Sequence, residues 1–131
     1  MATILVIEDG LAMRSIIATY LRKHGHTIVE ARTGHEGLRC HALGSGTFGL
    51  VVCDLILPEL GGIEAIRTIN AREPNLPILA ISGGAKTLAY LRSCDTPGRR
   101  AYLVKPFLLA DLVETVDRLL LESACPEKTL A

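Results

Sequence analysis

The sequence contains no tryptophan, few aromatic residues and no excess of charge of either sign. Its 14 Lys and Arg residues balance 14 Asp and Glu residues, so no overall field would concentrate the protein on nucleic acid or an anionic membrane. The apolar start, residues 3–7, is halted by Glu8 and Asp9, and no uncharged apolar run approaches membrane-spanning length. We therefore expect a soluble, cytoplasmic protein that binds neither a membrane nor nucleic acid directly.

Cysteine and histidine motifs for metal binding are also absent from the sequence. The four cysteines, at positions 40, 53, 94 and 125, form neither a Cys-x-x-Cys pair nor a compact disulfide framework. The four histidines lack the i, i+4 spacing of a helical metal-binding pair, and we expect them to be polar surface residues. Cys53 lies in an apolar run, which predicts a buried, reduced thiol that acts as a small hydrophobic side chain.

What the sequence does contain is an alternation of short apolar runs with longer segments of helical period. The runs cover residues 3–7, 27–31, 50–53, 77–81 and 101–104. Because these runs are apolar almost throughout, they are typical of strands inside a sheet that is covered on both faces. A chain of 131 residues is long enough for one domain with one such core.

The segments between the runs predict helices with one apolar stripe. In the first helix the expected stripe consists of Met13, Ile16, Ile17, Tyr20 and Leu21. Thr33 and Glu36 have the spacing of a capping box at the start of the second helix. The third is marked by Ile63, Ile66 and Ile69, and the fifth by the apolar period of residues 109–120. A fourth is supported by Leu88 and Leu91 and must end before Pro97.

Five strands and five helices in strict alternation imply right-handed crossovers and a parallel sheet. We therefore predict an α/β fold, a three-layer α/β/α sandwich, over residues 1–122. Residues 123–131 include Pro126 and few large apolar residues, which indicates a flexible C-terminal tail or a truncated linker.

Reactive and charged residues follow four of the five predicted strands. Glu8 and Asp9 follow the first strand, Asp54 the third, Ser82 the fourth and Lys105 the fifth. The carboxyl ends of parallel strands share one edge of the sheet, so we expect these side chains to meet there. Three carboxylates about 4 Å apart would repel by roughly 4 kcal/mol per pair at an effective dielectric constant near 20, so the site needs a cation.

Mg²⁺ is the cation that this donor set favours, since carboxylates and carbonyls suit it and no His or Cys ligand points to zinc. The three acidic charges would then be balanced by two from the metal and one from Lys105. A phosphoryl group could be accommodated there only by preorganised donors. Lys105, the Ser82 hydroxyl, the metal and backbone N–H groups of the loops are placed to supply them.

Four segments resemble the receiver domain of two-component response regulators, from Ile4 to about Leu120. Residues 4–9 resemble the opening of such domains, with Arg14 five residues after the second acid, Asp9. Residues 51–62 resemble the phosphoacceptor segment, with proline four and glycine eight residues past Asp54. Residues 79–83 match the strand that carries a hydroxyl, and residues 102–107 match the lysine motif with its aromatic residue.

The resemblance implies a flavodoxin-like receiver fold with strand order 2-1-3-4-5, in which Asp54 accepts a phosphoryl group. The donor would be the phosphohistidine of a histidine kinase or phosphotransfer protein, or a small phosphodonor. In such domains Mg²⁺ is held directly by Asp9 and Asp54 and by the backbone carbonyl that corresponds to Ile56. Glu8 would bind the ion mainly through water.

The resemblance also implies how the signal leaves the site. Lys105 would pair with the phosphate, and Ser82 would move to bond one of its oxygens. Tyr102 would follow Ser82 inward and remodel the face made by helix four, strand five and helix five, which a downstream effector protein reads. The domain would not be an enzyme, but a phosphoacceptor that catalyses its own phosphorylation and dephosphorylation. It would act as a monomer or a weak phosphorylation-dependent dimer.

Departures from the family pattern fall at four places. Gly10 and Gly61 stand where acidic or polar residues are common, Leu108 replaces a capping residue before the last helix, and residues 93–100 are unlike the usual end of helix four. A haloacid-dehalogenase-like phosphatase would need a second acid where Ile56 stands, and Glu8 and Asp9 would repel the phosphate of a flavodoxin-type cofactor. The remaining alternative is a pseudo-receiver, a protein-binding adaptor that is never phosphorylated.

Overall fold

The computed structural model describes residues 2–84, 89 and 100–124. The strands in these ranges are β1 (Thr3–Ile7), β2 (Thr27–Ala31), β3 (Leu50–Asp54), β4 (Ile78–Ser82) and β5 (Arg100–Val104). The helices are α1 (Leu11–Lys23), α2 (Gly34–Leu43), α3 (Gly62–Arg72) and α5 (Leu109–Ala124). The fourth helix, expected around Leu88 and Leu91, lies outside the described residues apart from Ala89.

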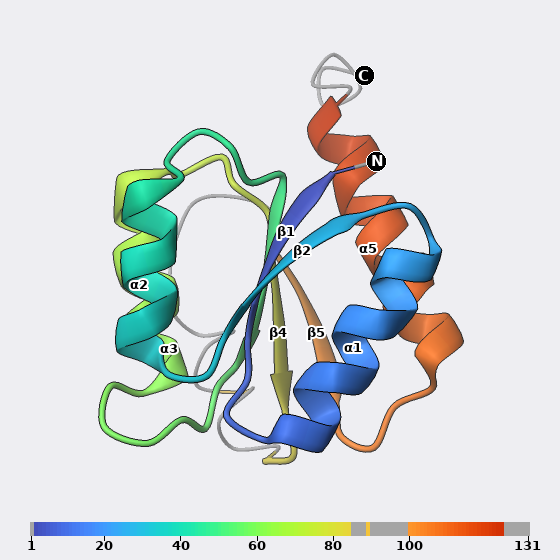
Figure 1. Ribbon diagram of the computed structural model, residues 1–131, viewed down its shortest axis with the longest axis horizontal. Coiled ribbons are helices and arrows are strands. Elements are labelled where there is room, and N and C mark those ends of the chain that lie inside the picture. The colour runs from blue at the N-terminus through green and yellow to red at the C-terminus, as the bar shows by residue number, and fades with distance from the viewer. Residues whose placement is uncertain (1, 85–88, 90–99, 125–131) are drawn as a thin grey trace.

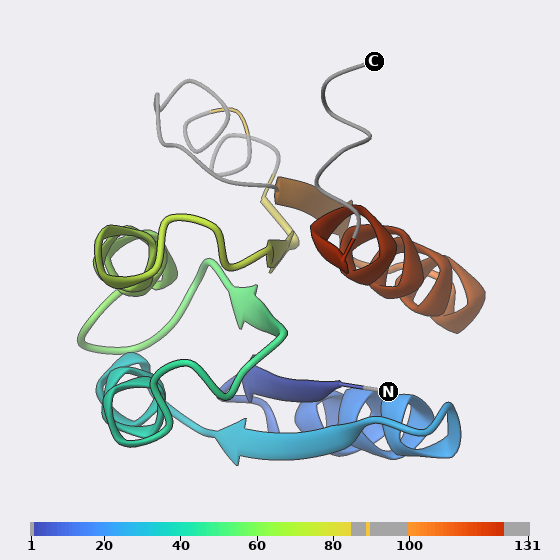
Figure 2. The ribbon, with the colours of Figure 1, turned by 90° about the horizontal axis from the view of Figure 1, so that it is seen from above.

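The strands form one parallel sheet in the order β2-β1-β3-β4-β5. Helices α1 and α5 cover one face of this sheet, and α2 and α3 cover the other (Figures 1 and 2). The α/β/α sandwich and the strand order 2-1-3-4-5 predicted from the sequence are therefore confirmed. None of the described helices has both the length and the apolar character needed to cross a membrane.

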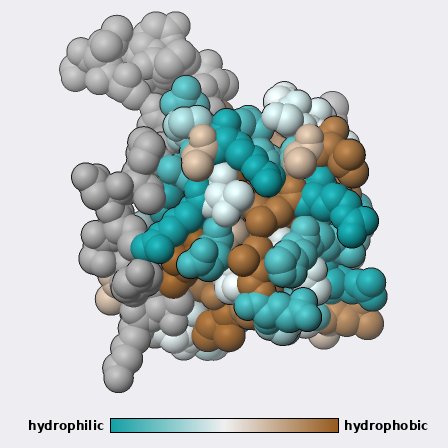
Figure 3. Space-filling model, turned by 90° about the vertical axis from the view of Figure 1, so that its left-hand side faces the viewer, coloured by the Kyte–Doolittle hydropathy of each residue, from teal (hydrophilic) through white to brown (hydrophobic). Residues whose placement is uncertain are grey.

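Alternate residues of each strand serve two separate apolar cores, because successive side chains of a strand point to opposite faces. On one face Ile4 and Val6 pack with Leu21 of α1 and Val116 of α5. On the other face the strand residues pack with Ile66 and its neighbours on α3. Hydrophilic side chains cover much of the outer surface of this second side, with hydrophobic groups between them (Figure 3).

The inward face of α1 differs from the expected stripe by one important exchange. Ile16 is 47% exposed, whereas Arg14 and Ala18 are buried together with Ile17 and Leu21. The buried set has the spacing i, i+3, i+4, i+7, so it forms one helical face that does not include position 16. Arg14 can occupy this face because its guanidinium finds hydrogen-bond acceptors there, and the prediction of an inward Ile16 was wrong.

Two of the four histidines, His26 and His41, are buried, so the expectation that all four lie on the surface was wrong. His41 Nε2 lies 2.8 Å from Glu73 Oε1, and its ring stacks on Phe48 with centroids 6.4 Å apart. The backbone N–H of Ala2 donates to His26 Nδ1 at 3.2 Å, and burial lowers the pKa of His26. Each buried ring has a polar partner, whereas the Nδ1 atom of His41 has none among the described residues.

The N-cap expected at Thr33 and the buried thiol expected at Cys53 are both confirmed. The Thr33 hydroxyl accepts a hydrogen bond from the backbone N–H of Glu36 at 3.0 Å, as a helix N-cap does. The Glu36 carboxylate accepts from the backbone N–H of Arg32 at 2.8 Å, one residue before the position that a full capping box would use. Cys53 is a fully buried free thiol, and its burial raises the pKa.

Candidate functional site

The carboxyl ends of β1, β3 and β5 bring two carboxylates and one ammonium group together. Lys105 Nζ lies 3.0 Å from Glu8 Oε1 and 2.8 Å from Asp54 Oδ2. Glu8 and Asp54 are both buried, whereas about a quarter of the Lys105 side chain (26%) is exposed. The ammonium group therefore bridges two buried acids at a point that solvent can still reach, as the positions of these residues after their strands predicted.

Asp9 completes an acidic cluster with Glu8 and Asp54. One carboxylate oxygen from each of the three residues lies within 4.8 Å of the other two, and Asp9 is the exposed member. Three carboxylates against one nearby ammonium leave two negative charges to balance, and every ligand atom in the set is a hard oxygen. A divalent cation such as Mg²⁺ fits both the charge and the donor chemistry of this cluster.

Burial, hydrogen bonds and neighbouring charges shift the pKa values of Glu8 and Lys105. Burial raises the pKa of Glu8, as does the charge of Asp54, although the Gly10 N–H and Lys105 oppose the change. For Lys105 burial lowers the pKa, but hydrogen bonds and charges from Asp54 and Glu8 outweigh it, so the pKa rises overall. The two acids therefore favour the charged form of Lys105.

The Asp54 carboxylate is also fixed by the loop that follows it. The backbone N–H of Ile56 donates to Asp54 Oδ1 at 2.9 Å, and the Ile56 side chain is 59% exposed beside the site. The loop returns to α3, whose first residue, Gly62, donates its backbone N–H to the Leu55 carbonyl at 3.1 Å. A Cβ at Gly62 would overlap the Asp54 carbonyl oxygen and lie 2.5 Å from Leu55 Cα.

We predict that Gly62→Ala lowers the free energy of unfolding by about 2 kcal/mol, because added volume against backbone typically costs roughly 1–3 kcal/mol. Gly61→Ala is the matched control, since a Cβ at Gly61 would meet nothing within 4 Å and its φ is −67°. Urea unfolding of both variants measures the difference. Equal stability of the two variants would contradict the close approach of α3 to Asp54.

Ser82 and Tyr102 lie on the neighbouring strands β4 and β5. Ser82 is buried, and its hydroxyl oxygen accepts a hydrogen bond from the backbone N–H of Gly84 at 3.0 Å. Tyr102 pairs with Ala80, is half-buried and packs against the core on the α3 side. Because Ser82 follows Ala80 by two residues, Ser82 and Tyr102 belong to the same face of the sheet.

Arg14 contacts the backbone of the acidic pair, a structural role that the sequence pattern did not predict. Its Nη1 donates to the Glu8 carbonyl at 3.0 Å, and its Nε lies 3.2 Å from Glu30 Oε1. The sequence signal that could have found it is the spacing: Arg14 precedes Ile17 by three residues and Ala18 by four, so all three share one face of the helix. Hydropathy alone would place such a residue in solvent.

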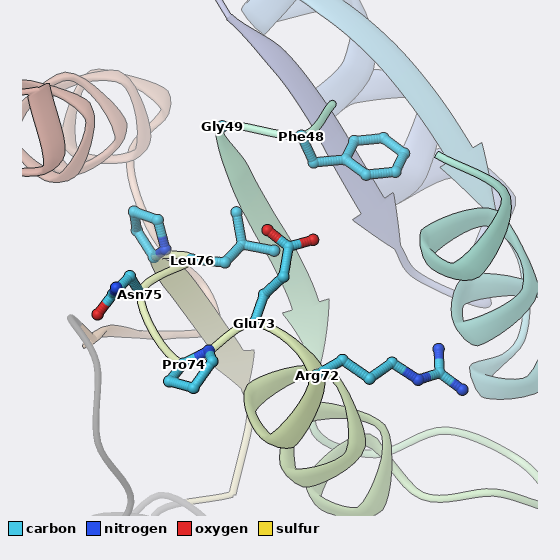
Figure 4. Close-up of a pocket in the computed structure, with 8 residues that line it drawn as sticks. Phe48, Gly49, Arg72, Glu73, Pro74, Asn75 and Leu76 are labelled. Atoms are coloured by element: carbon cyan, nitrogen blue, oxygen red, sulfur yellow. The ribbon is translucent and has the colours of Figure 1, made fainter. Parts of the chain in front are cut away.

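A pocket of about 420 Å³ lies at the opposite end of the strands, where β3 and β4 begin, and is lined by residues 48–49 and 72–77. Glu73 extends into this space near Phe48, whereas Arg72 points away from it (Figure 4). The Glu73 carboxylate accepts a hydrogen bond from the backbone N–H of Gly46 as well as contacting His41. The pocket is separated from the acidic cluster by the length of the strands.

The chain belongs to the response regulator receiver domain family, whose family model matches residues 4–117. It is 32% identical over 121 residues to the response regulator receiver protein CpdR of Brucella abortus, covering 92% of this chain and 98% of CpdR. It is also 32% identical over 119 residues to the sensor kinase CckA of the same organism, covering 91% of this chain. The chain spans only 12% of the length of CckA.

Solved structures support the same assignment. The response regulator protein TrrA from Thermotoga maritima, solved in complex with Mg²⁺-BeF, superposes with a TM-score of 0.78 at 28% identity. The match covers 91% of this chain and 99% of that one. The chain is therefore a receiver domain of two-component signalling, with an acidic cluster at the carboxyl edge of its sheet.

Proposed function

We propose that this domain accepts a phosphoryl group on Asp54, in a Mg²⁺-dependent reaction, from the phosphohistidine of a histidine kinase or phosphotransfer protein. The observation that carries the proposal is the Lys105 ammonium group held between Glu8 and Asp54 beside a third carboxylate, Asp9. This arrangement provides a buried nucleophile, a fixed cation and a set of oxygen ligands for a metal at one point of the sheet edge.

In the proposed reaction an Asp54 carboxylate oxygen attacks the phosphorus atom. The new O–P bond forms as the P–N bond breaks, the electron pair of the P–N bond stays on the imidazole nitrogen of the donor, and the leaving imidazole takes up a proton from solvent. Lys105 then exchanges its contact with Asp54 for the phosphate. The Ser82 hydroxyl exchanges its contact with the Gly84 N–H for a phosphate oxygen, to which it can donate.

The metal would be held by Asp9, by Asp54 and by the backbone carbonyl of Ile56, with Glu8 bound mainly through water. When bound, Mg²⁺ would neutralise charge that develops on the phosphate oxygens during transfer. The protein's own contribution is to hold Asp9 and Asp54 in place and to keep Lys105 charged next to them.

The output of the domain is proposed to follow from Ser82 and Tyr102, which share one face of the sheet. Movement of Ser82 toward the phosphate frees space into which Tyr102 turns, and this changes the surface around helix four, β5 and α5. A downstream effector protein would bind that surface, with the domain acting as a monomer or a weak phosphorylation-dependent dimer. The proposed receiver domain covers residues 1–122, and its last helix, α5, continues to Ala124. A cytoplasmic location of the protein stays a prediction.

Incubation of the purified protein with a small acyl phosphate tests this function. We expect intact-protein mass spectrometry to show one added phosphoryl group in the presence of Mg²⁺ and none when a chelator has removed the metal. Retention of the circular dichroism spectrum under both conditions controls for loss of the fold. An unmodified protein in the presence of Mg²⁺ would instead favour the pseudo-receiver, an adaptor that binds proteins without turnover of phosphate.

We predict slow loss of the phosphoryl group from the phosphorylated protein. Ile56 and Gly84, each two residues beyond a site residue, border the path of an attacking water, and neither has a side chain that can hydrogen-bond it. Ile56→Asn supplies such a group at an exposed position and should shorten the half-life. Release of inorganic phosphate with Mg²⁺ measures the rate, and a half-life of seconds in the unmodified sequence would contradict this prediction.

A further inference from the structure

Arg14 connects three elements beneath the acidic cluster. It is a buried residue of α1, and its Nη1 donates at 3.0 Å to the backbone carbonyl of Glu8, at the end of β1. Its Nε lies 3.2 Å from Oε1 of Glu30, on β2. A guanidinium group is rigid and planar, so two contacts made from different edges also fix its orientation.

Glu30 holds a second arginine on the same helix. Arg22 Nη2 lies 3.2 Å from Glu30 Oε2 and also donates to the Ile28 carbonyl at 3.2 Å. Arg14 and Arg22 therefore both tie α1 to β2 through one carboxylate. Of the two arginines, Arg14 also donates to the backbone carbonyl of Glu8, whereas the contacts of Arg22 are with Ile28 and Glu30.

The contact with Arg14 completes the set of restraints on Glu8. Its backbone N–H donates to the Ala31 carbonyl at 3.0 Å. Its side chain accepts from the Gly10 N–H at 2.9 Å and from Lys105 at 3.0 Å. The backbone carbonyl is the remaining polar group, and it is bonded to Arg14.

The restraint on the Glu8 carbonyl extends to the next residue. The Glu8 carbonyl, the Asp9 nitrogen and the Asp9 Cα lie in one peptide plane, so fixing the carbonyl oxygen also fixes where the Asp9 side chain begins. Asp9 is the exposed member of the acidic cluster, in contrast to Glu8 and Asp54. The peptide plane that Arg14 bonds therefore sets the point from which the Asp9 side chain reaches the cluster.

We propose that Arg14 is a positioning residue of the metal site: by bonding the Glu8 carbonyl, it holds Asp9 where it can bind Mg²⁺ together with Asp54. The inference rests on the proposed Mg²⁺ function of the cluster. Groups that orient metal ligands without touching the metal typically change affinity by about 10–100-fold when they are removed. Loss of the Arg14 contact should fall in the lower part of that range, because Glu8 keeps its other three restraints.

Calorimetric titration with Mg²⁺ tests the proposal on the full chain. We expect Arg14→Met, which keeps the length of the apolar stem, to weaken Mg²⁺ binding about 10-fold. The matched control is Arg22→Met, which also removes a partner of Glu30 but leaves the Glu8 carbonyl bonded, and it should bind as the wild type does. Urea unfolding of both variants separates this effect from stability, since both lose a tie between α1 and β2.

Arg14→Lys supplies a second test if the methionine variant does not fold. The ammonium group of lysine can bond either the Glu8 carbonyl or Glu30, but it cannot make both contacts as the planar guanidinium group does. We therefore expect a Mg²⁺ affinity between those of the wild type and Arg14→Met. Wild-type affinity in folded Arg14→Met or Arg14→Lys, or an equal loss in Arg22→Met, would overturn the positioning role alone. A wild-type protein that binds no Mg²⁺ would overturn the proposed metal function, and this inference with it.

Discussion

Asp54→Asn is expected to abolish phosphorylation by a small acyl phosphate while leaving the fold intact. The asparagine oxygen can still accept a hydrogen bond from the Ile56 N–H, and Lys105 keeps its contact with Glu8. The amide has no carboxylate oxygen to attack phosphorus, and it removes one negative charge from the acidic cluster, so Mg²⁺ binding should weaken as well. Intact mass spectrometry and calorimetric titration measure the two effects.

The control for this variant is Asp117→Asn on α5. The Asp117 side chain is 61% exposed and is not a member of the acidic cluster, so its loss changes the net charge by the same amount without altering the site. We expect the control to be phosphorylated as the wild type is. Equal labelling of Asp54→Asn and the wild type would show that another residue accepts the phosphoryl group.

Lys105→Met is predicted to slow phosphorylation about 100-fold, as removal of one preorganised donor to a developing charge typically does. The same substitution should strengthen Mg²⁺ binding, because Lys105 competes with the metal for oxygens of Glu8 and Asp54. The two measurements are therefore expected to change in opposite directions. Mass spectrometry of samples quenched at successive times gives the rate of phosphorylation, and calorimetric titration gives the Mg²⁺ affinity.

Lys23→Met, at an exposed position near the end of α1, is the control for the loss of one lysine. It should change neither the labelling rate nor the Mg²⁺ affinity. If Lys105→Met lost both rate and affinity together, Lys105 would be holding the geometry of the carboxylates rather than binding phosphate. Unchanged labelling of Lys105→Met would remove it from the reaction altogether.

The sheet and the meeting of Glu8, Asp54 and Lys105 could be predicted from the sequence. Buried parallel strands are apolar on both faces, so their runs are visible without knowledge of their partners. Their carboxyl ends share an edge, so residues 97 positions apart in the sequence, Glu8 and Lys105, could be expected to lie close together. The strand boundaries lie within one residue of the predicted ones: β3 ends at Asp54, β4 ends at Ser82 and β5 begins at Arg100.

The contacts that were not predicted join residues whose partners are distant and polar. Arg14 is buried because Glu30 and the Glu8 carbonyl accept its hydrogen bonds, and hydropathy takes no account of such partners. His41 is buried for the same reason, with Glu73 placed 32 residues away in the sequence. Helical periodicity assigns a side chain to the core by its own polarity, so charged residues that find partners across the fold are placed wrongly.

Reductive trapping tests most directly whether Asp54 is the phosphoacceptor. Borohydride reduces an aspartyl phosphate to homoserine, so the phosphorylated protein can be trapped, digested and sequenced by tandem mass spectrometry. We predict homoserine at position 54 after treatment with acyl phosphate and Mg²⁺, and aspartate there when the metal is chelated. Aspartate at position 54 in the labelled protein, or a reduced residue at Glu8 or Asp9 instead, would contradict the assignment of Asp54 as the phosphoacceptor.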